Sequence, residues 1–180
     1  MEKIFQLYIK LLTIILFTIM STKTVKANKS NFITLKTSKG SIVIKTLPKI
    51  APNHVKRIKE LVSSGFYNGI IFHRVIEGFM AQTGDPLGNG TGGSGKNLKA
   101  EFSDYEYKYG TVGMARSMNP DSGDSQFFIC FDGCGHLTGQ YTVWGQVETG
   151  MEVVEKIEIG EPPSNPDQII EAFVGKKKTK

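Results

Sequence analysis

The spacing of apolar and polar residues divides the chain into short strands and two helices. Residues 31–37 (NFITLKT) and 41–46 (SIVIKT) alternate apolar and polar positions with a period of two, which predicts two paired strands. Gly40 between them suits a tight hairpin turn. After Pro52 the apolar side chains instead recur three and four positions apart as far as Gly65, which predicts an amphipathic helix of about three turns.

More strand-like runs follow, separated by Gly, Asn and Asp turns. A second helix is predicted at 151–157, and no regular strand-helix-strand alternation is present. This order favours an antiparallel barrel or sandwich over a parallel sheet. The runs predicted as strands cover residues 69–75, 78–84, 98–102, 110–116, 125–131, 141–147 and 168–174.

Residues 1–27 have the pattern of a secretory signal peptide. Two lysines flank the start of an apolar segment, the block LLTIILFTIM (11–20) is uncharged, and a polar stretch then ends in the small residue Ala27. An uninterrupted block of this length is shorter than the roughly 20 residues of a spanning helix. We therefore expect an exported, periplasmic domain over 28–175, without stable membrane insertion after cleavage. An uncleaved tether that reaches back to Ile4 is the alternative.

The basic composition does not indicate a nucleic-acid partner. Of the net charge of +5, the leader holds +3 and the terminal KKKTK (176–180) holds +4, so the domain between them is slightly acidic. We expect that lysine run to be a disordered tail, and we expect no nucleic-acid binding. A composition of 39% hydrophobic and 22% charged residues is typical of one soluble globular domain.

The two cysteines leave a question that spacing cannot settle. Export would expose Cys130 and Cys134 to an oxidising compartment, where they could form a disulfide. Their spacing is not that of a thiol oxidoreductase, and Cys130 follows the apolar run FFI. A buried free thiol is therefore slightly favoured over a bridge, since geometry decides whether a disulfide forms.

Two further features suggest cofactor or metal chemistry but lack its context. The run GNGTGGSG (88–95) matches the glycine pattern of dinucleotide-binding loops, yet no strand leads into it and no helix follows. We interpret it as a tight surface loop. His54, His73 and His136 lie far apart and lack metal-ligand spacing, and His54 is expected on a solvated helix face. We expect no cofactor and no bound metal.

Arg74 stands in the middle of the apolar run IIFHRVI. On a strand it shares a face with Phe72 and Ile76, so a structural arginine that extends its charged head to water is one interpretation. The segments GFMAQ (78–82) and SQFFI (125–129) each combine large apolar side chains with a glutamine. Apolar walls with a few polar groups are typical of a binding cleft, which is the other interpretation.

Four blocks taken together are more specific than any single motif. FHRVIEGFMAQTGD, GNGTGGSG, MAR..NPDSGDSQFFI and HLTGQYTVWGQV occur in this order. With their spacing they resemble the cyclophilin family of peptidyl-prolyl cis/trans isomerases over residues 32–174. The resemblance implies a mainly β fold, a closed eight-stranded antiparallel barrel with an α-helix over each end. Its binding groove would lie on the outer surface of the barrel.

The resemblance also implies site residues and a mechanism that needs no cofactor. Arg74 would be the catalytic residue, donating a hydrogen bond to the prolyl nitrogen when the amide is twisted. Gln82 would bind the substrate backbone and help to orient Arg74, and His73 would be a structural or supporting hydrogen bonder. The proline pocket would consist of Phe79, Met80, Phe128 and Leu137, and the adjoining groove of Ala115, Arg116 and Gln126.

Two groove positions depart from well-studied members of that family. His136 stands where many eukaryotic cyclophilins have the tryptophan that contacts cyclosporin, and Tyr141 stands where they have a histidine. Both would still border the groove, but we expect weak cyclosporin binding.

The function implied is isomerisation of X-Pro bonds during the folding of exported proteins. The alternative is a non-catalytic binder of proline-containing polypeptides, or a chaperone, that uses the same groove. In either case the partners would be proline-containing clients, and we expect a monomer.

Overall fold

The computed structural model describes residues 30–176. The predicted leader (1–27) and most of the predicted lysine tail therefore lie outside the described residues. Of that tail only Lys176 is described, and its ammonium group lies 3.1 Å from a carboxylate oxygen of Glu148. Within residues 30–176 no helix is both long and apolar enough to cross a membrane.

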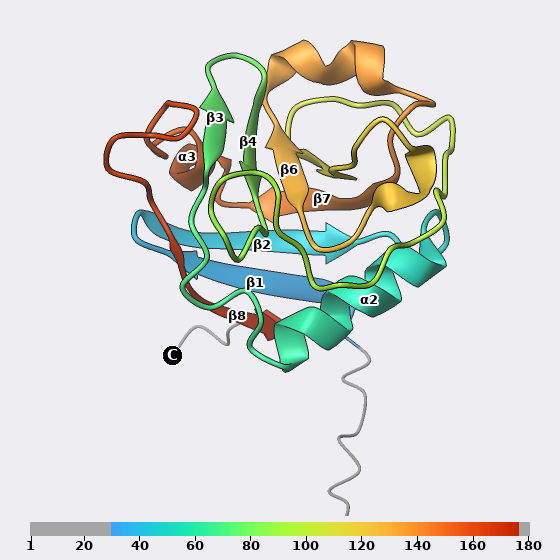
Figure 1. The fold of residues 1–180 in the computed structure, drawn as a ribbon, viewed down its shortest axis with the longest axis horizontal. Coiled ribbons are helices and arrows are strands. Elements are labelled where there is room, and N and C mark those ends of the chain that lie inside the picture. Colours follow the sequence, from blue (N-terminus) through green and yellow to red (C-terminus); the bar gives the residue numbers. More distant parts are fainter. Residues whose placement is uncertain (1–29, 177–180) are drawn as a thin grey trace, which may run out of the picture.

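Eight antiparallel strands form one curled sheet in the order β3-β4-β6-β5-β7-β2-β1-β8. In Figure 1 the strands β3, β4 and β6 stand steeply above the nearly level β1 and β2, so the sheet curls from one direction to the other. Within residues 30–176, two α-helices accompany the sheet. The strands are β1 (Phe32–Thr37), β2 (Gly40–Thr46), β3 (Arg74–Ile76), β4 (Met80–Thr83), β5 (Thr111–Met114), β6 (Phe127–Cys130), β7 (Val143–Thr149) and β8 (Ile169–Val174), and the helices are α2 (Pro52–Ser63) and α3 (Met151–Val154).

The main core fills the inside of the curled sheet. Because side chains alternate between the faces of a strand, β4 turns Ala81 inward and β6 turns Phe127 and Ile129 inward, where all three are buried. Trp144 of β7 is fully buried among them, with its ring 5.3 Å from that of Phe127. The same alternation leaves the neighbouring residues of β4 and β6 on the outer face, where the candidate site lies.

The expected barrel is correct in strand number and direction, but "closed" overstates it. The outer strands β3 and β8 do not pair along their length, and Ile71 and Gln168 form only an isolated bridge between the segments beside them. Residues 158–168, called the strap below, cover this seam. A second isolated bridge joins the strap to β3 at Val75 and Gly160.

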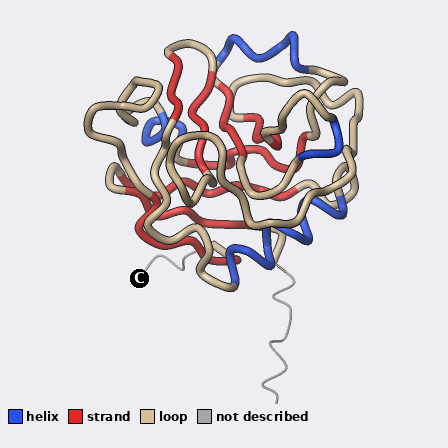
Figure 2. The backbone as a smooth tube through the Cα atoms, viewed as in Figure 1, coloured by secondary structure: helices blue, strands red, loops and turns tan. Residues whose placement is uncertain are grey.

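Most predicted elements occur, but one strand was wrong. The segment 98–102 makes a single bridge, from Leu98 to Gly123, and otherwise belongs to a long loop between β4 and β5. The tube drawing shows this loop running over the outside of the sheet (Figure 2). The apolar residues of 98–102 favoured a strand, but only Leu98 makes a bridge, and the segment joins no ladder.

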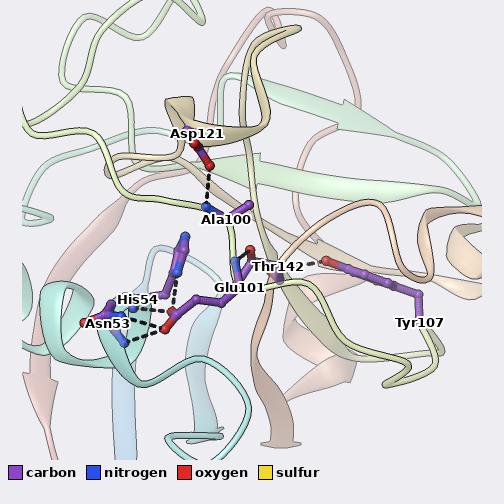
Figure 3. Close-up of polar contacts among 7 residues, drawn as sticks. All are labelled: Asn53, His54, Ala100, Glu101, Tyr107, Asp121 and Thr142. Carbon is purple, nitrogen blue, oxygen red and sulfur yellow. Dashed lines mark hydrogen bonds and ion pairs between the residues drawn. The ribbon is translucent and has the colours of Figure 1, made fainter.

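A carboxylate of this long loop holds the start of α2. Ala51 precedes the helix and offers no side-chain cap. Glu101 supplies the missing acceptors: its Oε1 accepts from the backbone N–H of Asn53 at 3.1 Å, and its Oε2 accepts from that of His54 at 3.0 Å (Figure 3). Unsatisfied N–H groups at a helix N-terminus favour such a negative partner.

The expected solvated position of His54 was wrong. Its side chain is only 1% exposed, and its ring nitrogen Nδ1 lies 2.6 Å from Oε2 of Glu101. A buried polar ring is tolerated when it has a hydrogen-bond partner, and here that partner is distant in sequence. Burial alone would raise the pKa of Glu101, but the hydrogen bonds from His54 and Asn53 outweigh it and lower the pKa.

We expect Glu101→Ala to lower the free energy of unfolding by about 2 kcal/mol at pH 7, because it removes a cap and leaves His54 without its partner. The lowered pKa means that the unfolded chain binds more protons. This part of the stability is therefore present above about pH 4.3, the unfolded value for Glu, and is lost as the pH falls through the lower folded value. Urea titrations at pH 7 and pH 3 measure both effects.

The charge effect is isolated by Glu101→Gln, which keeps one acceptor and should flatten the pH dependence in this acid range. Glu106→Gln removes an exposed carboxylate of the same loop and is the matched control. Equal acid sensitivity of Glu101→Gln and the parent chain would contradict the assignment.

Candidate active site

A row of opposed residues crosses the outer face of four strands. Arg74 of β3 lies opposite Gln82 of β4, Gln82 lies opposite Phe128 of β6, and Phe128 lies opposite Gly113 of β5. Directly opposed residues in an antiparallel sheet have Cβ atoms about 4.5 to 5.5 Å apart. The register therefore brings a guanidinium, an amide and an aromatic ring together on a rigid support.

A hollow of about 280 Å³ with an apolar floor opens beside this row. Its floor is a small second core, separate from that of the barrel, in which Met80, Phe128 and Leu137 are at most 8% exposed. Ten of the eleven residues expected from the sequence border the hollow: Arg74, Phe79, Met80, Gln82, Ala115, Arg116, Phe128, His136, Leu137 and Tyr141.

The floor depends on a glycine that the sequence reasoning missed. A Cβ atom at Gly113 would lie 2.5 Å from the Phe128 ring and 2.2 Å from the Tyr107 hydroxyl. The absence of a side chain there lets the Phe128 and Tyr107 rings stack at a centroid distance of 5.8 Å. Tyr107 was also missed. A glycine within a strand is the sequence signal for such a close approach, but only the register shows what approaches it.

The eleventh residue, Gln126, lies in the adjoining hollow of about 400 Å³, which also borders Gln82, Ala115 and Arg116. Its Oε1 accepts from Nε2 of Gln82 at 2.9 Å. Its own Nε2 donates to the carbonyl oxygens of Gly90 and Gly92 at 3.0 and 2.8 Å. The two glutamines thus connect strand β4 to the glycine-rich loop.

That loop is arranged around a carboxylate of the protein itself. Asp85 is 1% exposed, and its oxygens accept from the backbone N–H groups of Leu87, Asn89 and Gly90 at 2.8, 3.1 and 2.6 Å. Burial opposes its ionisation, but these backbone hydrogen bonds lower the pKa of Asp85 overall. Donors that a dinucleotide-binding loop would direct at phosphate are engaged here, as expected for a structural surface loop.

Arg74 is oriented by a residue that the sequence did not suggest. Its Nε donates to Oε2 of Glu161 at 2.7 Å, and its Nη1 lies 3.9 Å from the sulfur of Met80. Gln82 was expected to orient Arg74, but the Gln82 side-chain amide is directed to Gln126. Glu161 lies 87 residues further along the chain, so no local pattern connects it to the arginine.

His73, the neighbour of Arg74 in the chain, is buried close to the glycine-rich loop. Burial lowers the pKa of its ring, and the charge of Arg74 acts in the same direction against the opposing charge of Asp85. A neutral ring at neutral pH follows. Gln126 lies near enough to influence this pKa, but its amide nitrogen is directed at the loop carbonyls and neither ring nitrogen has a hydrogen-bond partner within residues 30–176. The expected hydrogen-bonding role is therefore not seen.

The expectation of a free thiol at Cys130, which the sequence slightly favoured, was also wrong. Cys130 and Cys134 form a disulfide, with their Cα atoms 6.0 Å apart, and both are fully buried. The 3-10 helix η2 (Asp132–Leu137) brings the second cysteine back to the end of β6, within the usual Cα range for a bridge. The disulfide therefore connects the strand of Phe128 to the helix of Leu137, two parts of the same hollow.

Stacked side chains form another part of the wall of the hollow. The His136 ring stacks on Phe79 at 5.5 Å, with 25° between the ring planes. The guanidinium carbon of Arg116 lies 4.3 Å from the centre of the Tyr141 ring, and Nη2 of Arg116 donates to the Gln140 carbonyl at 3.0 Å. Within residues 30–176, no three His, Cys, Asp or Glu side chains gather closely enough to hold a metal ion.

Comparisons with known proteins agree with this architecture. The model of the cyclophilin type peptidyl-prolyl cis-trans isomerase family matches residues 32–174. A probable peptidyl-prolyl cis-trans isomerase of Brucella abortus is 49% identical over 165 residues, covering 82% of this chain and 84% of the relative. A peptidyl-prolyl cis-trans isomerase of Helicobacter pylori is 43% identical over 137 residues, covering 74% of this chain and 83% of the relative.

Solved structures give the same result. A cyclophilin from Hirschia baltica superposes with a TM-score of 0.73 at 30% identity, covering 81% of this chain and 74% of that one. A cyclophilin-type isomerase of Cryptosporidium parvum, crystallised in the presence of the dipeptide Ala-Pro, has a TM-score of 0.75 at 27% identity and covers 81% of this chain and 99% of that one. From its sequence and its fold, this chain belongs to the cyclophilin-type peptidyl-prolyl cis-trans isomerases.

Proposed function

We propose that this isomerase accelerates rotation about X-Pro bonds in exported proteins while they fold, with Arg74 stabilising the twisted amide. The observation that supports this most directly is the position of Arg74 beside the hollow. Its guanidinium stands at the rim, with Nη1 3.9 Å from the sulfur of Met80 on the floor. A proline ring seated on that floor would hold its nitrogen within reach of a donor.

The chemistry follows from amide resonance. Rotation about a peptide bond has a barrier of about 18 to 20 kcal/mol because the nitrogen lone pair is delocalised into the carbonyl group. In the twisted state the lone pair is localised and becomes a good hydrogen-bond acceptor. A donor held at that nitrogen therefore binds the transition state more strongly than either ground state, which is the condition for catalysis. No cofactor is required by this mechanism.

The other groove residues would hold the substrate while one side of the bond turns. Phe79, Met80, Phe128 and Leu137 offer an apolar seat for the ring. Gln82 would bind the substrate backbone, with its own amide held by Gln126. The clients would be proline-containing polypeptides, and a monomer would suffice because one chain provides the whole groove.

Two observations support export. The leader has the composition of a signal peptide. The Cys130–Cys134 disulfide is of the kind that persists in oxidising compartments such as the periplasm. A leader that is not cleaved would leave the same domain tethered to the membrane.

We expect Arg74→Ala to lower kcat/KM for a short X-Pro peptide by about one to two decades, because a charge-assisted hydrogen bond contributes about 1.5 to 3 kcal/mol and each decade corresponds to about 1.36 kcal/mol. Arg74→Lys should recover only part of this, since lysine keeps the charge but loses the planar fork. A protease-coupled assay on residues 28–180 measures the rates. Lys56→Ala, which removes an exposed charge from α2, is the control.

Two other outcomes of this assay are informative. If the parent and the variant are both inactive but still bind proline peptides, the groove is a recognition surface and the binder alternative replaces catalysis. If Arg74→Ala keeps the parent rate, the isomerase works without this donor and the proposed mechanism fails.

The compartment is tested by producing the full chain with its own leader in a bacterium and fractionating the cells. We expect a periplasmic protein that begins at Asn28 and shows no reactive thiol until it is reduced, as N-terminal sequencing and alkylation would report. Retention of residue 1 in the membrane fraction would indicate the tethered form. A cytoplasmic protein with two reactive thiols would contradict export.

Weak cyclosporin binding is expected because the stacked His136 and Phe79 rings offer less area than a tryptophan would. His136→Trp should strengthen inhibition by roughly tenfold, since a larger aromatic contact contributes about 1.4 kcal/mol. Inhibition titrations of the parent and the variant provide the comparison. A nanomolar inhibition constant for the parent chain would overturn this expectation.

A further inference from the structure

The ion pair between Arg74 and Glu161 is set by the backbone. The strap hydrogen-bonds to β3 in both directions at one point: the Val75 N–H donates to the Gly160 carbonyl at 2.8 Å, and the Gly160 N–H donates to the Val75 carbonyl at 3.0 Å. In this antiparallel register, the residue after Gly160 stands opposite the residue before Val75. Glu161 is therefore the cross-strand neighbour of Arg74, at the distance at which opposite charges pair.

The strap is also fixed at its far end. Asp167 is 7% exposed, and its carbonyl accepts from the Phe72 N–H at 2.8 Å. Its carboxylate accepts from the Ser38 hydroxyl at 2.6 Å and from the Glu158 N–H at 2.9 Å. Hydrogen bonds on both sides of Glu161 thus hold this connection, although most of its side chains are exposed.

The bend that brings Glu161 to the groove requires a glycine. Gly160 has φ +151°, and a Cβ atom there would lie 2.6 Å from Cα of Pro163. A residue with a side chain there would clash with the strap's own backbone, so this bend could not form unchanged. Pro163 is itself buried, so the strap has little room to adjust.

The atom that Glu161 contacts decides what the contact can do. The Glu161 carboxylate accepts from Nε, on the edge of the guanidinium away from Nη1. Arginine has five N–H donors in a fixed plane, so holding Nε also sets the direction of the other two nitrogens. One of them, Nη1, is directed toward the hollow, at 3.9 Å from the Met80 sulfur.

We propose that Glu161 is a positioning residue, which holds the Arg74 guanidinium at the angle from which it donates to the prolyl nitrogen. The proposal rests on the proposed role of Arg74. With 39% and 52% of the two side chains exposed, the pair should add little to the stability of the fold. Its effect is on the rate, because an arginine that samples many rotamers would reach the reactive geometry less often.

The test introduces Glu161→Ala and Glu161→Gln separately into the parent chain and into the Arg74→Ala variant. Each product is compared with the chain from which it was made. We expect Glu161→Ala to lower kcat three- to tenfold while KM changes less than twofold, and Glu161→Gln to recover part of the loss through its remaining acceptor. In the Arg74→Ala background, Glu161→Ala should change nothing further. Exchange NMR at several peptide concentrations separates kcat from KM. Glu77→Ala, an exposed carboxylate near the same strand, is the matched control.

A readout independent of turnover follows the arginine itself. In the parent chain the side-chain Nε–H signal of Arg74 should be protected from exchange with water, and Glu161→Ala should remove this protection without changing the melting temperature. An unchanged or faster kcat for Glu161→Ala, or the same loss in both backgrounds, would overturn the positioning role. Failure of the proposed function is distinguishable, because it would appear in the Arg74→Ala single variant.

Discussion

The register of β3, β4, β6 and β5 is the constraint on which the site depends. One row of opposed positions carries Arg74, Gln82, Phe128 and Gly113 on the outer face, while the neighbouring positions fill the barrel core. A shift by one residue would exchange the two sets, exposing core side chains and burying the arginine. Burial of the core therefore enforces the geometry of the groove, because the residues that line it stand on the opposite side of the same strands.

Outside the sheet, buried or partly buried carboxylates accept the backbone hydrogen bonds that a neighbouring strand would otherwise accept. Asp85 holds the glycine-rich loop, Glu101 joins the long loop to α2, and Asp167 fixes the strap, each by accepting backbone N–H groups. Asp124 does the same for Gly95 and Lys96. Loops without a ladder still need partners for their backbone donors, and an ionised acceptor forms stronger hydrogen bonds than a neutral one.

The sequence predicted what depends on local pattern. Period-two alternation located β1 and β2, and short strand-like runs between turn residues located the other six strands, although β3 occupies only the end of its predicted run. The misses share a physical cause. The positions of His54 and Glu161 and the space beside Gly113 depend on residues 47, 87 and 15 positions away. The disulfide depends on a 3-10 helix that the sequence FFIC does not predict. The apolar segment 98–102 resembled a strand but makes only one isolated bridge, at Leu98.

The position of Arg74 in an apolar run is explained by two opposing requirements. To donate to a substrate as proposed, the guanidinium must stand beside an apolar seat, where less water competes for the hydrogen bond. The guanidinium must also be held in one orientation. A carboxylate is the strongest available hydrogen-bond partner for this purpose, but its negative charge offsets the positive charge of the arginine. Contact through Nε reconciles the two, since the carboxylate engages the edge of the fork away from the hollow. Because both side chains are partly exposed, solvent screens the charge of Glu161 and reduces its effect on the positive charge of Arg74. The backbone register still holds the two side chains next to each other.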